Sequence, residues 1–175
     1  MSKISSSESY VIWEEIIGKA RLEDGREPLF RGYFEATIFA FENLRQGLSA
    51  KLAKELAGSG LEESALKKII AESEHNERLV SDAAADIKAT LDRDSACNSP
   101  LEVFLFYKGF AALQSHRLAN HLWLKGKKLL ALLIQSHVSN CFGIDIHPAA
   151  KIGRGIMLDH ATGLVIGETA IVGDA

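Results

Sequence analysis

Cysteine is scarce in this 175-residue chain, which has only Cys97 and Cys141. The two lie far apart and form neither a CxxC pair nor a disulfide framework, so we expect free thiols in a reducing cytoplasm. Long apolar runs are also missing: the longest, Leu129–Ile134, is far short of the roughly 20 residues that a membrane span needs. Met1–Tyr10 is rich in serine and lacks a signal-peptide core. We therefore expect a cytoplasmic protein that does not bind membranes.

The chain also has no excess of basic over acidic residues. Lys and Arg number 20 and Asp and Glu number 23, which gives a net charge of −3. This balance argues against a uniformly basic surface, so we expect no nucleic-acid partner. No set of Cys, His and acidic residues has metal-ligand spacing, so we expect no metal site. With 47% hydrophobic and 25% charged residues, the composition is that of a folded globular protein.

Residues 1–140 have the apolar spacing of helices, and proline is rare there. A polar loop, Asp92–Pro100, divides this region, and Lys125-Gly126-Lys127 breaks the helical pattern after it. A turn is also expected at Glu23-Asp24-Gly25. The predicted helices cover residues 12–20, 30–41, 44–56 (ending at Gly58-Ser59-Gly60), 61–70, 79–91 and two segments between 101 and 140.

A period of six residues replaces the helical period after residue 140. In an α-helix, residues six apart are separated by a net rotation of about 240°, so they would not share one face. Aliphatic residues at this period, with many glycines between them, predict a parallel β-helix with 18-residue coils. The repeating positions are Ile146, Ile152, Leu158, Leu164 and Ala170.

The fold class predicted from these patterns is α+β, with a helical domain at residues 1–140 and the first coils of a β-helix at 141–175. Five hexapeptides make less than two coils, whereas solenoids need about three repeats and a cap. We therefore expect the chain to stop inside its second domain. We also expect residues 1–175 alone to have little or no catalytic activity.

The segment Phe106–Val172 resembles the serine acetyltransferase family of hexapeptide-repeat acyltransferases. Three blocks carry the resemblance: Asp145-Ile-His-Pro-Ala-Ala-Lys-Ile-Gly, Asp159-His-Ala-Thr-Gly and Gly167-Glu-Thr-Ala. The resemblance implies a left-handed β-helix and acetyl transfer from acetyl-CoA to L-serine in cysteine biosynthesis, with no permanently bound cofactor. It further implies a homo-oligomer, a trimer or a dimer of trimers. A C-terminal tail, absent here, would bind the partner enzyme O-acetylserine sulfhydrylase (cysteine synthase).

Acyl transfer to a hydroxyl needs a base, and histidine is the side chain whose pKa suits that role near neutral pH. His75, His116, His121 and His137 fall in helical segments, where packing or surface roles are usual. His160 follows Asp159 at a hexapeptide boundary, so its side chain should point outward. By resemblance, His160 is the general base and Asp145 the carboxylate that orients it.

Asp145 could instead cap the first coil, and we interpret His147, which precedes Pro148, as structural. By resemblance, Asp159 and Asp94 bind the serine ammonium group, although Asp86 and Asp92 lie close to Asp94 in the sequence. No serine or cysteine is placed as a nucleophile, which favours direct attack within a ternary complex. The residues that bind acetyl-CoA are expected mostly beyond residue 175.

Two other functions remain open on the sequence alone. One is a non-catalytic helical oligomerisation module that carries a short β-helix stub. The other is a hexapeptide acyltransferase for a different acceptor, such as a sugar.

Overall fold

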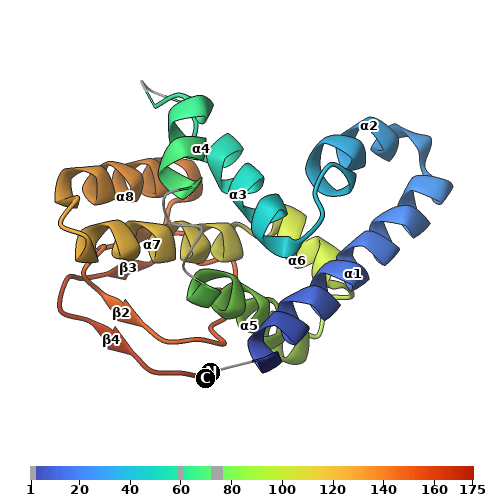
Figure 1. Cartoon of the computed structure of the whole chain (residues 1–175). Coiled ribbons are helices and arrows are strands. Elements are labelled where there is room, and N and C mark those ends of the chain that lie inside the picture. The colour runs from blue at the N-terminus through green and yellow to red at the C-terminus, as the bar shows by residue number, and fades with distance from the viewer. Residues whose placement is uncertain (1–2, 59–60, 72–76) are drawn as a thin grey trace.

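A computed structural model describes residues 3–58, 61–71 and 77–175. Ser59 and Gly60 of the predicted helix end, and the predicted helical residue His75, lie outside these residues. Figure 1 shows helices over most of the molecule and a short stranded coil at one side, below the antiparallel helices α7 and α8. Helix α1 and the segment after it extend from the opposite side as an arm.

The arm begins with α1 (Lys3–Arg26). This helix runs through Gly25, where a turn was predicted, and ends one residue later. The next predicted helix, residues 30–41, is instead a series of short turns. They are η1 (Pro28–Phe30, a 3₁₀ turn), α2 (Arg31–Phe34) and η2 (Glu35–Phe39, a π-helical turn). Pro28 starts η1, and the Glu27 side chain accepts a hydrogen bond from the Leu29 N–H.

Two helices outside the arm, α3 (Leu44–Glu55) and α6 (Pro100–Phe106), begin with a side-chain N-cap. The Asn43 side chain caps α3, and Ser99 caps α6, where proline occupies the first turn. Between them lie α4 (Glu63–Ala71) and α5 (Glu77–Arg93), which match predicted helices.

The region from 101 to 140, predicted to hold two helices, instead holds α6, α7 (Lys108–Leu124) and α8 (Lys128–Phe142). The additional break is at Tyr107, whose backbone is extended (φ −83°, ψ 104°). At the other end, Gly143 adopts the left-handed conformation (φ 67°) and ends α8.

The stranded region contains β1 (Asp145–Ile146), β2 (Lys151–Ile152), β3 (Val165–Ile166) and β4 (Ile171–Val172). Strand β1 pairs with β3 and β2 pairs with β4, both in parallel. Each partner lies 20 residues further along the chain, 145 with 165 and 151 with 171, rather than the expected 18. Parallel pairing between successive turns agrees with a coil, whereas its left-handed sense stays a prediction.

The two extra residues change the register of the repeat. Ile146 pairs with Ile166, not Leu164, and Ile152 pairs with Val172, not Ala170. The six-residue spacing therefore holds from Ile146 to Leu158 and shifts by two residues afterwards. The shift falls at the turn that contains His160.

One hydrophobic core joins the helices to the start of the coil. The cluster that holds Trp13 and Phe104, whose rings pack edge to face, continues to Ile144, Ile146 and Ala150. Helix α8 ends at Phe142, close to the predicted boundary, and the division into 1–140 and 141–175 stays a prediction. Within the described ranges, no helix is both long and apolar enough to cross a membrane.

Candidate functional site

His160 lies on an exposed turn at the point where the coil gains its extra residues. His160 and Ala161 both have positive φ, 47° and 54°, although neither is glycine. The Ala161 N–H donates to the Asp159 carbonyl, which closes the turn tightly. Left-handed backbone costs an ordinary residue roughly 1–2 kcal/mol, and such strain is commonest at functional sites.

The imidazole of His160 is therefore held in the open. It is 92% exposed, and its Nε2 lies 3.8 Å from Oδ1 of Asp159, which is 64% exposed. A base that must reach a bound substrate needs this accessibility. The predicted outward orientation of His160 agrees with the structure.

The start of α7 holds this turn in place. Lys108 Nζ donates to Thr162 Oγ1 at the far end of the turn. The next residue, Gly109, packs so closely that an added Cβ would overlap the carbonyl oxygen of Leu158. Glycine is thus required at 109 by the close approach of two backbones.

Asp94 lies in the loop before α6 and is held by the same segment. Its Oδ2 accepts a hydrogen bond of 3.1 Å from the Tyr107 hydroxyl, and its Oδ1 accepts one of 2.9 Å from the Ala96 N–H. Burial, together with contacts to Cys97 and Asp94, raises the pKa of Tyr107, so the phenol stays protonated and donates. Three consecutive residues, 107 to 109, thus contact both the Asp94 loop and the His160 turn.

Asp145, on β1, has a different set of contacts. Its Oδ1 accepts a hydrogen bond of 2.6 Å from Nε2 of Gln135 on α8, and its backbone N–H donates to the Leu164 carbonyl at 2.9 Å. The His160 turn lies nearby, since the Gly163 N–H donates to the Gly143 carbonyl at 2.7 Å. Over the described parts of the chain, no hydrogen bond or ion pair joins Asp145 to His160, and their pairing stays a prediction.

The other histidines have contacts of a packing kind. The His147 ring stands edge to face with Trp123 (centroids 5.1 Å apart), and its Nδ1 accepts from the Ala149 N–H. His116 is buried, and this burial, together with the nearby Arg117 charge, lowers its pKa to about 4. Burial and two neighbouring lysines also lower the pKa of His121.

A buried ion pair that was not predicted from the sequence attaches the coil to the helices. Arg117 of α7 contacts both carboxylate oxygens of Asp86 on α5 at 2.8–3.0 Å. The same guanidinium donates to the Gly153 carbonyl (2.7 Å), while Asp86 Oδ1 accepts from the Ile156 N–H (2.9 Å). Burial raises the pKa of Asp86, and the Arg117 charge counteracts that increase.

This pairing also separates Asp86 from the substrate-binding candidates. Its carboxylate is buried and fully engaged, so it is not available to a ligand, whereas Asp94 lies beside the start of α7. The only sequence signal for the pair was an acidic and a basic residue on two amphipathic helices, which usually indicates solvated charges. Among the described residues, no group of three or more His, Cys, Asp or Glu side chains is arranged to hold a metal ion.

Comparison with known proteins gives these residues a family context. A family model described as "Serine acetyltransferase, N-terminal" matches residues 12–115, more than half of the chain. The chain belongs to the serine acetyltransferase family. The matched range ends inside α7 and so includes Asp94 and the segment that holds it.

Two curated members of the serine acetyltransferase family illustrate the likeness. "Serine acetyltransferase 4" of Arabidopsis thaliana is 46% identical over 164 residues, which cover 93% of this chain and 46% of the relative. The serine acetyltransferase of Salmonella typhimurium is 42% identical over 165 residues, which cover 94% of this chain and 60% of the relative. The chain thus spans about half to three fifths of the length of these two relatives.

Solved structures of serine acetyltransferases share the fold. A soybean serine acetyltransferase complexed with serine has a TM-score of 0.91 at 40% identity, covering 95% of this chain and 69% of that one. A serine acetyltransferase in complex with CoA has a TM-score of 0.91 at 41% identity, covering 93% and 70%. A serine acetyltransferase from Vibrio cholerae has a TM-score of 0.90 at 43% identity, covering 93% and 64%.

Proposed function

We propose that this chain provides the helical domain (residues 1–140) and the first coils of the β-helix domain (141–175) of a serine O-acetyltransferase. The observation that carries the proposal is the placement of His160, exposed on a strained turn that the start of α7 ties to the Asp94 loop. Family membership indicates the substrates: one related structure is a complex with serine and another is a complex with CoA.

In the proposed reaction, a neutral His160 accepts the proton of the serine hydroxyl as the hydroxyl oxygen attacks the carbonyl carbon of acetyl-CoA. The new C–O bond forms, the C–S bond breaks, and the departing sulfur takes the proton from the imidazolium. The products are O-acetylserine and CoA. Asp145 stabilises the imidazolium, as the carboxylate does in a catalytic triad, and no acyl-enzyme forms.

Asp94 and Asp159 bind the serine ammonium group in this proposal. Asp94 suits the role because Tyr107 and the Ala96 N–H orient its carboxylate while leaving further acceptor positions. Asp159 adjoins the base, which would place the ammonium near the reacting hydroxyl. The residues that bind acetyl-CoA are proposed to lie mostly outside residues 1–175.

The proposed assembly is a cytoplasmic homo-oligomer, a trimer or a dimer of trimers, built on a left-handed β-helix. The proposed partner enzyme is O-acetylserine sulfhydrylase. These features rest on the resemblance to the family, and the parallel pairing of β1 with β3 supports the β-helix.

The test is an acceptor screen with the full-length protein and acetyl-CoA. Release of the CoA thiol is followed with L-serine, L-threonine, glucosamine and no acceptor, and the acetylated product is identified by mass spectrometry. The proposal requires L-serine to be the best acceptor and the product to carry the acetyl group on oxygen. Preference for the sugar, or thiol release that does not depend on any acceptor, would refute it.

A further inference from the structure

Among the described residues, Gln135 makes the one side-chain hydrogen bond to the Asp145 carboxylate. It lies on α8, ten positions before Asp145, and the chain turns back at Gly143 between them. The amide Nε2 donates to Asp145 Oδ1 at 2.6 Å, and both side chains are half-buried.

The bond fixes one oxygen of the carboxylate, and no described residue donates a hydrogen bond to the other. Since the Asp145 backbone is held by the Leu164 carbonyl, the side chain is fixed at both ends. A carboxylate that orients an imidazole needs this arrangement, because rotation about its Cβ–Cγ bond would turn the accepting oxygen away. A carboxamide also suits the role because it donates without adding charge.

We propose that Gln135 is a positioning residue that holds Asp145 in the orientation needed to act on His160. The inference rests on the proposed function, because it gives Gln135 a role only through the Asp145–His160 pair. Titratable or charged groups on the elements around Asp145 are His160 and Asp159 on the turn, Lys108 at the start of α7, Lys128 and His137 on α8, and Lys151 on β2.

The first test compares kcat in full-length variants. Gln135→Met keeps the length of the side chain and removes the donor, so kcat should fall about 10-fold to 100-fold, the value of one hydrogen bond to a charged group. KM for both substrates should change little. The matched control is Asn140→Met on the same helix, which removes an exposed amide that has no side-chain hydrogen bond in the described structure.

The second test uses pH to separate positioning from packing. In Gln135→Glu, two carboxyl groups would face each other, and a shared proton would restore the donor. The activity of this variant relative to the unmodified protein should therefore rise as pH is lowered. For Gln135→Met, this ratio should stay constant. A Gln135→Met protein with normal kcat, or a Gln135→Glu ratio that does not vary with pH, would overturn the inference.

A third measurement does not depend on turnover. Carbethoxylation of His160 by diethyl pyrocarbonate, followed by mass spectrometry, reports how reactive the exposed imidazole is. Gln135→Met and Asp145→Asn should slow it by the same factor, while Asn140→Met should not. Slowing in Asp145→Asn alone would overturn the inference, as would slowing in neither variant. Absence of serine acetylation in the unmodified protein would instead refute the proposed function, and the labelling would still decide the role of Gln135.

Discussion

Helix α7 and the coil beside it are stabilised in opposite ways. From Gly109 to Ala119, every residue of α7 is buried, including Gln114, His116 and Arg117. In the coil, by contrast, Val165 and Ile171 are 71% and 74% exposed, and each strand has two residues. The helical part depends almost wholly on buried side chains, whereas the coil adds backbone pairing and contacts from α7 to a small apolar interior that includes Ile146 and Ala150.

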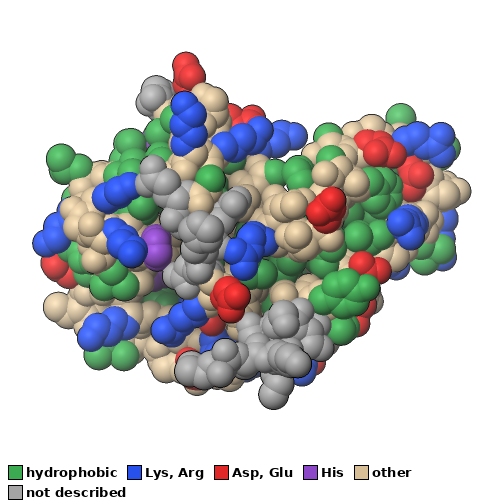
Figure 2. Space-filling view, viewed as in Figure 1, with side chains coloured by type: hydrophobic (Ala, Val, Ile, Leu, Met, Phe, Trp, Pro, Cys, Tyr) green, Lys and Arg blue, Asp and Glu red, His purple; other side chains and the backbone are tan. Residues whose placement is uncertain are grey.

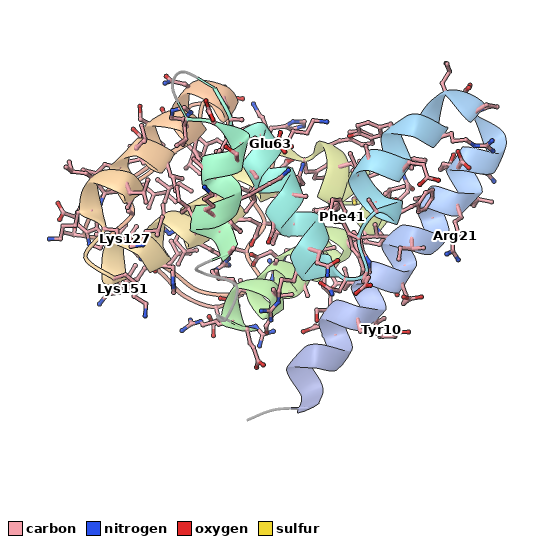
Figure 3. The ribbon with its side chains drawn as sticks, turned by 45° about the horizontal axis from the view of Figure 1, so that its top comes forward. Tyr10, Arg21, Phe41, Glu63, Lys127 and Lys151 are labelled. Carbon is pink, nitrogen blue, oxygen red and sulfur yellow. The ribbon has the colours of Figure 1, made fainter. Side chains whose placement is uncertain are left out.

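Figure 2 shows a related contrast on the surface. Lys and Arg side chains gather at the end of the molecule where α7 turns into α8 and where β2 lies. Figure 3 places Lys127 and Lys151 at that end, while Arg21 and Tyr10 lie along α1 on the other side. Because α7 is buried and the His160 turn is exposed, changes in α7 should reduce the stability of the fold, whereas changes in the turn should reduce turnover.

The largest expected effect is a loss of turnover on changing His160 in the exposed turn. His160→Ala should lower kcat by about 10²-fold to 10⁴-fold, the usual contribution of a general base, with no loss of stability because the side chain is exposed. His147→Ala should cost stability instead, because its ring packs on Trp123. Steady-state kinetics and denaturant melts of both variants provide the measurement. The assignment fails if His147→Ala loses turnover and His160→Ala keeps it.

The next largest effect is a loss of stability on changing Arg117 of α7. Arg117→Met leaves the buried Asp86 carboxylate without its cation and should lower the free energy of unfolding by about 3–5 kcal/mol. Arg78→Met alters a pair with Asp82 in which the arginine side chain is 75% exposed, and should cost less than about 1 kcal/mol. Urea denaturation followed by circular dichroism measures both. Equal losses would show that burial does not set the strength of these pairs.

The pH dependence of the free energy of unfolding tests the burial of His116, which lies on α7 where the helices meet the coil. Folding lowers the pKa of His116 from 6.5 to about 4, so the unfolded chain binds the extra proton first. Stability should therefore fall as pH drops from about 6.5 to about 4, by up to about 3 kcal/mol, with no further contribution below that. The difference between the unmodified protein and His116→Gln, measured by denaturation at several pH values, isolates this contribution. A difference that does not change with pH would contradict it.

The smallest effect compares two glycines in helices. An added methyl at Gly109 would overlap the Leu158 carbonyl and should cost about 1–3 kcal/mol, while disturbing the His160 turn and reducing kcat. Gly18 of α1 has open space around it, so Gly18→Ala should be neutral or stabilising by up to about 1 kcal/mol. Thermal melts and kinetics would give both values. Similar results for the two variants would mean that α7 does not fix the turn.

Periodicity in the sequence predicted much of the helical part and the change at residue 140. It failed at Gly25, where the helix continues through a glycine, and where the backbone changes without a glycine or proline to mark it. Tyr107 breaks the helix with no such signal, and His160 and Ala161 take positive φ, which sequence patterns assign to glycine. The resulting 20-residue turn therefore could not be predicted from a six-residue repeat.

Contacts between side chains that are distant in the sequence also could not be predicted. Asp86 and Arg117 both look like surface charges on amphipathic helices, and only packing of α5 against α7 buries them together. Gln135 and Asp145 come together because the chain reverses at Gly143; the glycine signals the end of the helix but not the direction in which the chain leaves it. The residue types at His160, Asp145, Asp94 and Asp159 were informative only because the motifs around them resembled a family.

The contact between Arg117 and the backbone of the coil has a consequence for protein engineering. This guanidinium binds the coil through the Gly153 carbonyl, and Asn120 likewise donates to the Pro148 carbonyl. Main-chain groups are common to all sequences, so the helices recognise the path of the coil more than its side chains. A foreign repeat with the same path and small residues at its close contacts could be grafted onto this helical base, which would make the base a reusable foundation for designed solenoids.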